Sequence, residues 1–219
     1  LDNPWERGAF GLGCYGSLEF DPVRFPDPKG MIRRIHAAGV RFMLWVSPQV
    51  RKKPGCPGSV YGDANTVEDD EFFLVDLTKP AAKAQFERRL AAVVALGVDG
   101  IKADRADELD LEPLALHGGP GAREHNRIPV LFADSVATVL RARHGNDFAT
   151  LGRAAFTGSH TRLRGFFGLD LPHDFRGLSE AVRMIQNAGV SGFPFWGADV
   201  GGYAGDSEIT SEILVRWAQ

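Results

Sequence analysis

The feature that most constrains this chain is a helical segment followed by a short apolar segment, a pattern that occurs four times. The helical segments cover residues 28–39, 79–97, 130–144 and 179–188, and the apolar segments after them cover residues 41–46, 98–104, 147–153 and 192–197. Glycine closes most of the helical segments, as it does at many helix C-termini. Helices that alternate with short buried strands predict parallel βα units and therefore an α/β fold.

The ends of these strands favour a closed barrel over an open doubly wound sheet. Several strands end in polar side chains, as barrel active sites require, and these are Asp104, Arg153, Asp170 and Asp199. A fifth candidate strand, residues 165–170, has no long helix before it. Five strands and a strand tip at residues 1–2 are too few to close a barrel of eight, which usually takes about 250 residues. We therefore expect a (β/α)8 TIM barrel that is incomplete, with about strands 2 to 7 in residues 1–219.

Composition excludes several classes of partner. The net charge is −3 and both signs are mixed along the chain, so neither nucleic acid nor a membrane surface is an expected partner. No apolar run approaches the roughly 18 residues of a transmembrane helix. The chain opens on Leu1 without a Met or a signal-peptide pattern, so we expect its natural start to be missing. Localisation and oligomeric state stay open, with the cytoplasm favoured because no targeting segment is visible.

The sequence indicates no metal and no organic cofactor. Cys14 and Cys56 lie in no spacing typical of zinc sites, and we interpret them as reduced, with one bridge between them left open. The six histidines show no HExxH or triad spacing. Neither a dinucleotide-binding glycine pattern nor a P-loop pattern is present, so nucleotide binding is not indicated.

Asp104 is the strongest candidate for chemistry. It ends the strand-like segment 98–104, where a barrel places its catalytic side chains, and Lys102 leaves the same face two residues earlier. A single acid at a strand end fits a helix N-cap equally well. Asp104 departs from that pattern because a long irregular loop follows it, as in a lid or a binding loop.

Asp170 is the second candidate, although turn chemistry also explains an acid close to a proline, and Asp174 is its rival in the same loop. Two carboxylates at one barrel mouth form the pair that a glycoside hydrolase uses. Trp5, Trp45 and Trp196 lie close to strand ends and are placed to stack on sugar faces, although each alone fits a position in the core.

Five motifs occur in order along nearly the whole chain. They are Leu1-Asp2-Asn3-Pro4-Trp5, Phe20-Asp21-Pro22 with Phe25-Pro26-Asp27-Pro28, Leu44-Trp45-Val46-Ser47-Pro48, Gly100-Ile101-Lys102-Ala103-Asp104 and Phe195-Trp196-Gly197-Ala198-Asp199-Val200-Gly201-Gly202-Tyr203. The Lys-x-Asp pattern alone is weak, because related α-galactosidase families share it. With all five motifs in register, the chain resembles glycoside hydrolase family 31, the family of α-glucosidases and α-xylosidases.

The resemblance implies a role for each residue of the candidate site. Asp104 matches the catalytic nucleophile, Asp170 the general acid/base, and Asp2 the acid that binds the outer hydroxyls of the sugar in subsite −1. The other matches are Arg153 as a contact to sugar hydroxyls, Lys102 as a flanking cation, Trp45 and Trp196 as pocket wall, Asp199 as a supporting acid, Tyr203 as an aromatic near the pocket, and Phe167 at a position usually held by tryptophan.

The sequence also departs from the family. Around the acid/base the family often has Trp-Gly-Gly-Asp, whereas this chain has Phe167-Gly168-Leu169-Asp170. A sugar-contacting histidine that follows the next strand in the family lies beyond Gln219. The first and eighth barrel strands and the flanking β-domains are absent, so we expect residues 1–219 to form one partial catalytic barrel.

The resemblance implies a retaining α-glycoside hydrolase that acts on an α-linked oligosaccharide or glycoside by double displacement and needs no cofactor. Lys102 and Arg153 are expected to keep Asp104 ionised, whereas Asp170 needs a drier or more acidic setting to hold a proton.

Alternative functions remain. An α-glucan lyase or a transglycosylase of the same family would use the same residues, and a non-catalytic carbohydrate-binding barrel differs in whether Asp104 and Asp170 face one pocket. A phosphate-binding barrel needs a glycine-rich anion loop, for which residues 197–202 are the one candidate, and Asp199 there disfavours an anion.

Overall fold

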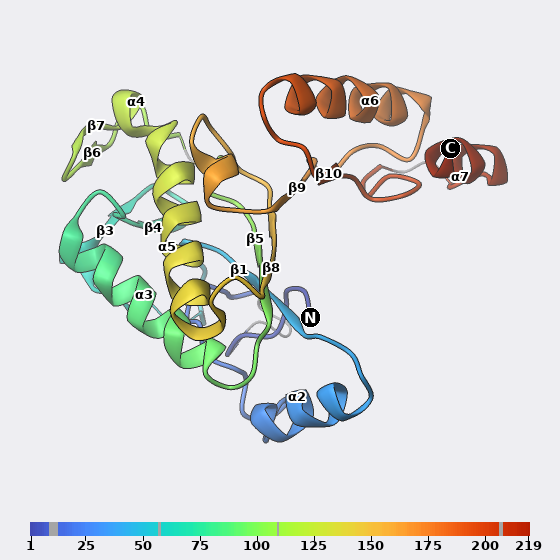
Figure 1. Cartoon of the computed structure of the whole chain (residues 1–219). Coiled ribbons are helices and arrows are strands. Elements are labelled where there is room, and N and C mark those ends of the chain that lie inside the picture. Colours follow the sequence, from blue (N-terminus) through green and yellow to red (C-terminus); the bar gives the residue numbers. More distant parts are fainter. Residues whose placement is uncertain (9–12, 57, 109, 206–207) are drawn as a thin grey trace.

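A five-stranded parallel sheet organises the computed structural model, which describes residues 1–8, 13–56, 58–108, 110–205 and 208–219 (Figure 1). The strands are β1 (Met43–Val46), β5 (Gly100–Ala103), β8 (Ala149–Gly152), β9 (Gly165–Phe167) and β10 (Trp196–Gly197). They pair in the order of the sequence, β1-β5-β8-β9-β10, and every pair is parallel. All five strands expected from the sequence are therefore present.

The first residue extends the sheet beyond β1. The terminal amine of Leu1 donates to the carbonyl of Met43 at 2.7 Å, and the amide of Trp45 donates to the carbonyl of Leu1 at 3.0 Å. This pairing matches the strand tip expected at residues 1–2. The sheet does not close on itself within the described residues, so the fold is an incomplete TIM barrel, as the strand count predicts.

Helices connect the parallel strands. They are α2 (Pro28–Ala37), α3 (Pro80–Val94), α5 (Arg127–His144) and α6 (Phe175–Val190), with α4 (Gly121–Glu124) before α5 and α7 (Ser211–Ala218) near the end of the chain. Two of them begin earlier than the sequence pattern predicts, α5 by three residues and α6 by four. Helix α6 begins at Phe175 because the Asp174 carboxylate accepts the amide of Gly177 at 2.9 Å and so caps the first turn.

The main hydrophobic core lies where α3 and α5 pack side by side against β1 and β5 (Figure 1). Phe86 of α3 and Phe132 of α5 meet edge to face, with ring centroids 5.8 Å apart. The indole of Trp5 is fully buried in this core, and its Nε1 donates to the carbonyl of Trp45 at 2.8 Å. Of the two alternatives for Trp5, sugar stacking and a position in the core, the structure supports the core, because no face of its ring reaches solvent.

Two small antiparallel units occupy the connections at the carboxyl ends of β1 and β5. After β1 comes a three-stranded sheet with the order β2-β4-β3, formed by β2 (Gln49–Arg51), β3 (Thr66–Glu68) and β4 (Phe72–Val75). After β5 comes the hairpin of β6 (Ala115–Leu116) and β7 (Gly119–Pro120). The sequence pattern predicts neither unit. Both lie at the end of the sheet where a barrel carries its active site.

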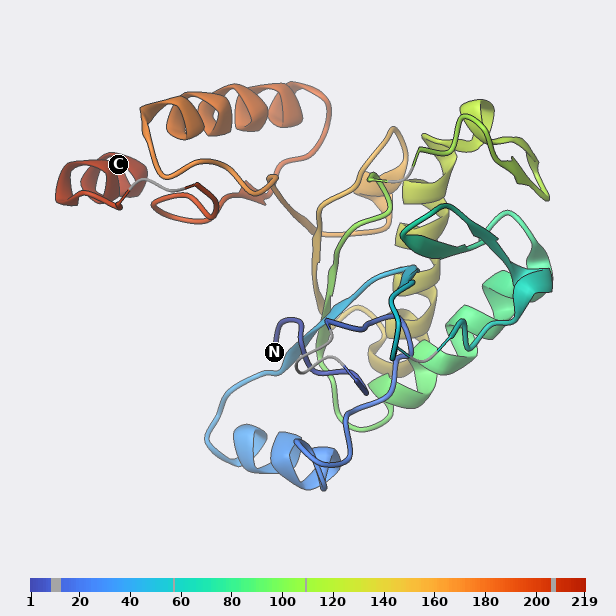
Figure 2. The same cartoon turned by 180° about the vertical axis from the view of Figure 1, so that it is seen from behind.

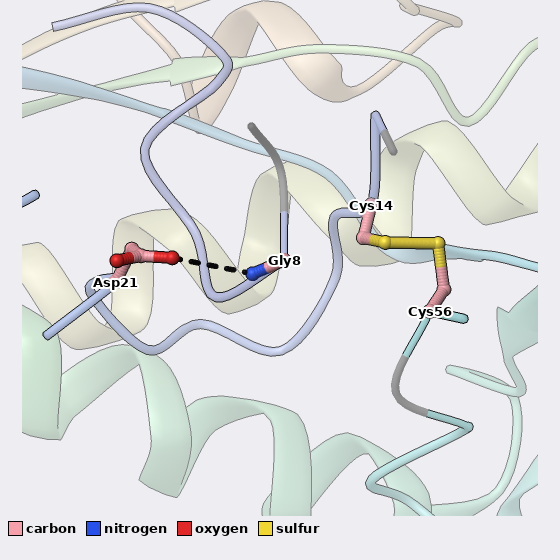
Figure 3. The surroundings of a disulfide bond; sticks show 4 residues. All are labelled: Gly8, Cys14, Asp21 and Cys56. Atoms are coloured by element: carbon pink, nitrogen blue, oxygen red, sulfur yellow. Dashed lines mark hydrogen bonds between the residues drawn. A yellow bond between two sulfur atoms is a disulfide. The ribbon is translucent and has the colours of Figure 1, made fainter. Parts of the chain in front are cut away.

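Cys14 and Cys56 form a disulfide with their Cα atoms 5.4 Å apart (Figure 3). The interpretation of both cysteines as reduced is therefore wrong. The bridge forms because the amide of Arg51 in β2 donates to the carbonyl of Tyr15 at 3.2 Å, which places the Cys14 segment beside the loop that follows β2. Disulfides persist mainly in oxidising compartments, which does not favour the cytoplasmic location expected above.

The C-terminal part of the chain, with α6 and α7, projects away from the α3 and α5 side of the molecule (Figure 1 and Figure 2). Apolar side chains of α6 are exposed here, among them Val182 and Ile185. Exposed apolar side chains on α6 agree with a sheet that has no further strand beside β10 among the described residues. Within the residues that the structure describes, no helix has the length and apolar character to cross a membrane.

Candidate active site

A cavity of about 300 Å³ opens at the carboxyl ends of the parallel strands. Nine of the ten site residues expected from the sequence line it, together with two that were not expected, Asn3 and Arg105. The lining residues are Asp2, Asn3, Trp45, Lys102, Asp104, Arg105, Arg153, Phe167, Asp170, Asp199 and Tyr203. Its size is at the lower end of the range of small-molecule sites.

Trp196 is the expected site residue that does not line this cavity. It lines a neighbouring hollow of about 630 Å³, which shares Asp2, Lys102, Phe167 and Asp199 with the first cavity. Its ring packs against Gly168, where a Cβ would lie 2.8 Å from the indole. The glycine after Phe167 therefore gives the tryptophan its place beside β9.

Asp104 follows β5 and is 9% exposed. Its amide donates to the carbonyl of Val46 at 2.9 Å, which continues the β1–β5 pairing by one residue. Oδ1 of Asp104 accepts the backbone amide of Arg105 at 2.7 Å and lies 3.1 Å from Nη1 of Arg153. Oδ2 accepts the indole Nε1–H of Trp45 at 2.6 Å. These donors, and not a helix N-terminus, hold the carboxylate.

Arg153 follows β8, and its side chain is 6% exposed. Its Nη2 lies 2.9 Å from Asp107 and 2.5 Å from Glu108, in addition to the contact of Nη1 with Asp104. Burial acts to lower the pKa of Arg153, but the hydrogen bond to Asp107 and the charges of Asp104, Asp107 and Glu108 raise it above its ordinary value. Arg153 is therefore a permanent cation that joins Asp104 to the loop after β5.

Lys102 lies in the same cavity as Asp104, as the two-residue spacing predicts, but its direct partner is Asp2. Its Nζ is 2.7 Å from Oδ2 of Asp2 and 4.8 Å from the centre of the Phe167 ring. The cation next to Asp104 is therefore Arg153. The Lys102–Asp2 pair instead forms the part of the cavity wall between β5 and the chain start.

Asp170 comes from the loop after β9 and is exposed. Partial burial raises the pKa of its carboxyl, and the negative charges of Asp104 and Asp199 raise it further, against the opposite effect of Arg153 and Lys102. Asp170 is therefore only partly shielded from water, and the charges of the neighbouring acids also contribute to its raised pKa. A carboxyl with a raised pKa holds its proton more readily near neutral pH.

Backbone hydrogen bonds tie the Asp170 loop to the loop after β10. The amide of Tyr203 donates to the carbonyl of Leu171 at 2.8 Å, and the amide of His173 donates to the carbonyl of Ala204 at 3.1 Å. These bonds bring Asp199 and Tyr203 to the side of the cavity that carries Asp170. Asp174, the rival acid, caps α6 and does not line the cavity.

Asn3 and Arg105 are not predicted from the sequence, and they directly follow the predicted residues Asp2 and Asp104. Arg105 and Ala106 adopt positive φ angles of 65° and 78°, which turn the chain sharply after the strand. That turn directs Arg105 back into the cavity wall. No sequence pattern predicts the turn, because neither residue is glycine. In the described part of the chain, no group of three or more His, Cys, Asp or Glu side chains is arranged to hold a metal ion.

Comparisons with known proteins identify the family of the chain. The family model for the glycosyl hydrolases family 31 TIM-barrel domain matches residues 2–219. Among curated relatives, α-xylosidase XylQ of Lactiplantibacillus pentosus is 27% identical over 98% of this chain and 30% of its own length. An α-xylosidase of Emericella nidulans is 25% identical over 92% of this chain and 27% of its own length. The chain thus spans about a third or less of the length of these relatives.

Solved structures show the same fold. A GH31 α-xylosidase from a soil metagenome, complexed with xylose, superposes with a TM-score of 0.81 at 23% identity, over 92% of this chain and 33% of the other. A GH31 sulfoquinovosidase from E. rectale, in complex with an aza-sugar inhibitor, has a TM-score of 0.77 at 25% identity over the same shares. The family model, which covers all but one residue, decides the assignment: the chain belongs to glycoside hydrolase family 31 and carries part of its TIM-barrel domain.

Proposed function

We propose that this protein is a retaining α-glycoside hydrolase in which Asp104 is the nucleophile and Asp170 the general acid/base. One observation carries the proposal: the two carboxyl groups line the same cavity in unlike electrostatic settings. Three donors surround Asp104 and stabilise a carboxylate, whereas neighbouring acids and partial burial raise the pKa of Asp170. A pair of carboxyls with such different settings supports a division between nucleophile and acid.

The reaction proceeds in two displacements. In the first, a carboxylate oxygen of Asp104 bonds to the anomeric carbon, the glycosidic bond breaks, and Asp170 gives its proton to the leaving oxygen. In the second, the Asp170 carboxylate takes a proton from water, whose oxygen bonds to the anomeric carbon as the bond to Asp104 breaks. Both carboxyl groups then return to their starting states, and the sugar leaves with its anomeric configuration retained.

The other lining residues bind the sugar. The Asp2–Lys102 pair is suited to hydrogen-bond two neighbouring hydroxyls, since one partner accepts and the other donates. The rings of Trp45 and Phe167 form apolar wall, with Trp196 in the adjoining hollow, and Tyr203 and Asp199 lie on the Asp170 side. Arg153 is suited to a hydroxyl contact only through the donors that its carboxylate partners leave free.

We further propose that the substrate is an uncharged α-glucoside or α-xyloside. Each cation of the described cavity wall already has a carboxylate partner: Lys102 pairs with Asp2, and both Arg105 and Arg153 pair with Glu108. A sulfonated or carboxylated sugar would need a cation without such a partner to offset the loss of its hydration. This charge pairing favours the activity of the α-xylosidase relatives over that of the sulfoquinovosidase neighbour.

An α-glucan lyase or a transglycosylase remains a second candidate, because the first displacement is identical in these enzymes. A non-catalytic carbohydrate-binding barrel is less well supported, since binding alone gives no reason for two carboxyl groups in unlike settings to line one cavity.

A panel of p-nitrophenyl α-glycosides, including the glucoside, xyloside, galactoside and sulfoquinovoside, tests the proposal with the full-length protein. Retaining hydrolysis is expected, with the α-anomer of the free sugar appearing first in the NMR spectrum. Release of the β-anomer first would contradict double displacement. An unsaturated product would identify a lyase, and a preference for the sulfoquinovoside would contradict the proposal of an uncharged substrate.

The Asp104→Ala variant tests the nucleophile separately. Turnover should be lost, and azide should restore part of it by forming a glycosyl azide, because the small anion fills the space of the missing carboxylate. Asp147→Ala is the matched control, since Asp147 forms an exposed ion pair with Arg41 outside the cavity. Unchanged hydrolysis by Asp104→Ala would end the assignment.

A further inference from the structure

Tyr15 lies behind the wall of the candidate active site. It is 4% exposed and does not line the cavity, so it makes no contact with a bound sugar. Its ring contacts two groups that do line the cavity. The Trp45 ring meets it edge to face with centroids 5.4 Å apart, and the guanidinium of Arg105 lies 5.1 Å from its centre.

The two groups that Tyr15 supports are the donors to opposite oxygens of Asp104. Trp45 donates its indole N–H to Oδ2 at 2.6 Å, and Arg105 donates its backbone N–H to Oδ1 at 2.7 Å. A displacement of either donor changes the direction in which the carboxylate points. Tyr15 therefore contacts both of these residues, one of which donates to each oxygen of the Asp104 carboxylate.

The backbone of Arg105 needs such support. A non-glycine residue with φ of 65° is in a left-handed conformation that its surroundings must hold, and Ala106 follows with φ of 78°. The Arg105 side chain is fixed by the rings of Tyr15 and Phe72 and by an ion pair with Glu108. The ring of Tyr15 thus helps to keep the amide of Arg105 directed at Asp104.

Tyr15 is itself held in place from the other side. The residue before it forms the Cys14–Cys56 disulfide (Figure 3), and the carbonyl of Tyr15 accepts the amide N–H of Arg51 at 3.2 Å. The residue after it, Gly16, has φ of 95°, and a Cβ there would collide with the carbonyl of Gln49. The loop is therefore fixed against β2 on both flanks of Tyr15.

The hydroxyl of Tyr15 has no part in this arrangement. It is buried and makes no hydrogen bond of ordinary geometry among the described residues, although Arg51 and Arg105 lie close enough to act on its charge. Burial raises the pKa of Tyr15 to about 12, so the phenol stays protonated near neutral pH. What Tyr15 supplies is its ring.

We propose that Tyr15, anchored by the Cys14–Cys56 disulfide, is a positioning residue whose ring holds Trp45 and Arg105 in the places from which they orient Asp104. This inference rests on the proposed role of Asp104 as nucleophile. It also gives the disulfide an indirect role in orienting Asp104, because the bridge fixes Cys14, the residue next to Tyr15.

Three variants of the full-length protein test the proposal. Tyr15→Leu removes the ring, Tyr15→Phe keeps it without the hydroxyl, and Tyr61→Leu removes another buried tyrosine ring, which packs on Phe86 and not on Trp45. For Tyr15→Leu we expect kcat per titrated active site to fall on the order of 10²-fold with KM nearly unchanged, because the nucleophile is misplaced while the sugar contacts remain. Tyr15→Phe and Tyr61→Leu should keep the wild-type kcat.

A second readout does not depend on activity. The indole N–H of Trp45 is buried and hydrogen-bonded, so its exchange with D₂O, followed by NMR, should be slow in the wild type. We expect faster exchange in Tyr15→Leu and wild-type exchange in Tyr15→Phe, with Trp45→Phe identifying the signal. If Tyr15→Leu does not fold, the paired change Cys14→Ser and Cys56→Ser replaces it, and the same faster exchange is expected.

Wild-type kcat and wild-type indole exchange in Tyr15→Leu would overturn the positioning role. A loss of kcat in Tyr61→Leu equal to that in Tyr15→Leu would also overturn it, since general destabilisation would then explain both. A wild type that hydrolyses no glycoside contradicts the proposed function and not this inference, which the indole exchange still decides.

Discussion

The indole Nε1 of Trp45 donates a 2.6 Å hydrogen bond to Oδ2 of Asp104 across the neighbouring strands β1 and β5. The register places Trp45 opposite Lys102, so its side chain reaches the carboxylate that follows two residues later. One hydrogen bond thus links the third of the five motifs, which contains Trp45, directly to the fourth, which ends in Asp104.

Trp45→Phe removes this donor and keeps an aromatic ring. A hydrogen bond to a charged group contributes about 1.5–3 kcal/mol, so kcat/KM should fall by about tenfold to a hundredfold. Steady-state kinetics on an activated α-glycoside give the comparison. Trp217→Phe in α7 is the control, since Trp217 does not line the cavity. Equal activity of Trp45→Phe and wild type would show that the hydrogen bond has no catalytic role.

The raised pKa of Asp170 predicts the alkaline side of the pH profile. As general acid, Asp170 must carry a proton, so kcat/KM should decline as pH rises through its folded pKa. Asp170→Asn should abolish that decline. The variant should also lose far more activity on alkyl glycosides than on dinitrophenyl glycosides, whose leaving groups need little protonation. Equal losses on both substrates would contradict the assignment.

The same shift predicts the sign of a stability change. Because folding raises the pKa of Asp170, the protonated carboxyl is favoured in the folded state, and its contribution is present below the unfolded pKa and lost as pH rises through the folded pKa. Asp170→Asn should therefore keep or raise the thermal midpoint at pH 7, as measured by calorimetry. A clear fall in Tm would mean that the ionised carboxylate stabilises the fold.

Arg153→Leu should destabilise the protein strongly. Its buried guanidinium is the shared cation of Asp104, Asp107 and Glu108, and removing one partner of a buried ion pair costs about 3–5 kcal/mol. Urea denaturation measures the loss. Arg41→Leu is the control, because its pair with Asp147 is exposed to solvent and should contribute little to stability. Similar losses in the two variants would contradict the central position of Arg153.

Local signals explain what the sequence predicts correctly. Apolar runs, helical spacing and closing glycines identify all five parallel strands, and Gly39 with φ of 78° follows α2 as expected. The strand-end acids Asp104 and Asp170 come together because parallel strands end at one edge of a sheet. Their motifs also identify the family.

Long-range contacts explain what the sequence does not predict. Strands β2, β3 and β4 have three or four residues each and acquire their partners only when the loop after β1 folds back. The Cys14–Cys56 bridge depends on that pairing, and so does the contact of Tyr15 with Arg105. Arg105 itself enters the cavity through left-handed backbone angles that its residue type does not favour.

The central claim is that Asp104 forms the glycosyl–enzyme bond, and peptide mapping after trapping tests it most directly. A 5-fluoro-α-glycosyl fluoride that accumulates the intermediate should add one sugar mass to the full-length protein, and the labelled peptide should carry it on Asp104. A label on Asp170 or on another carboxylate, or rapid hydrolysis of natural substrate by Asp104→Ala, would contradict the account.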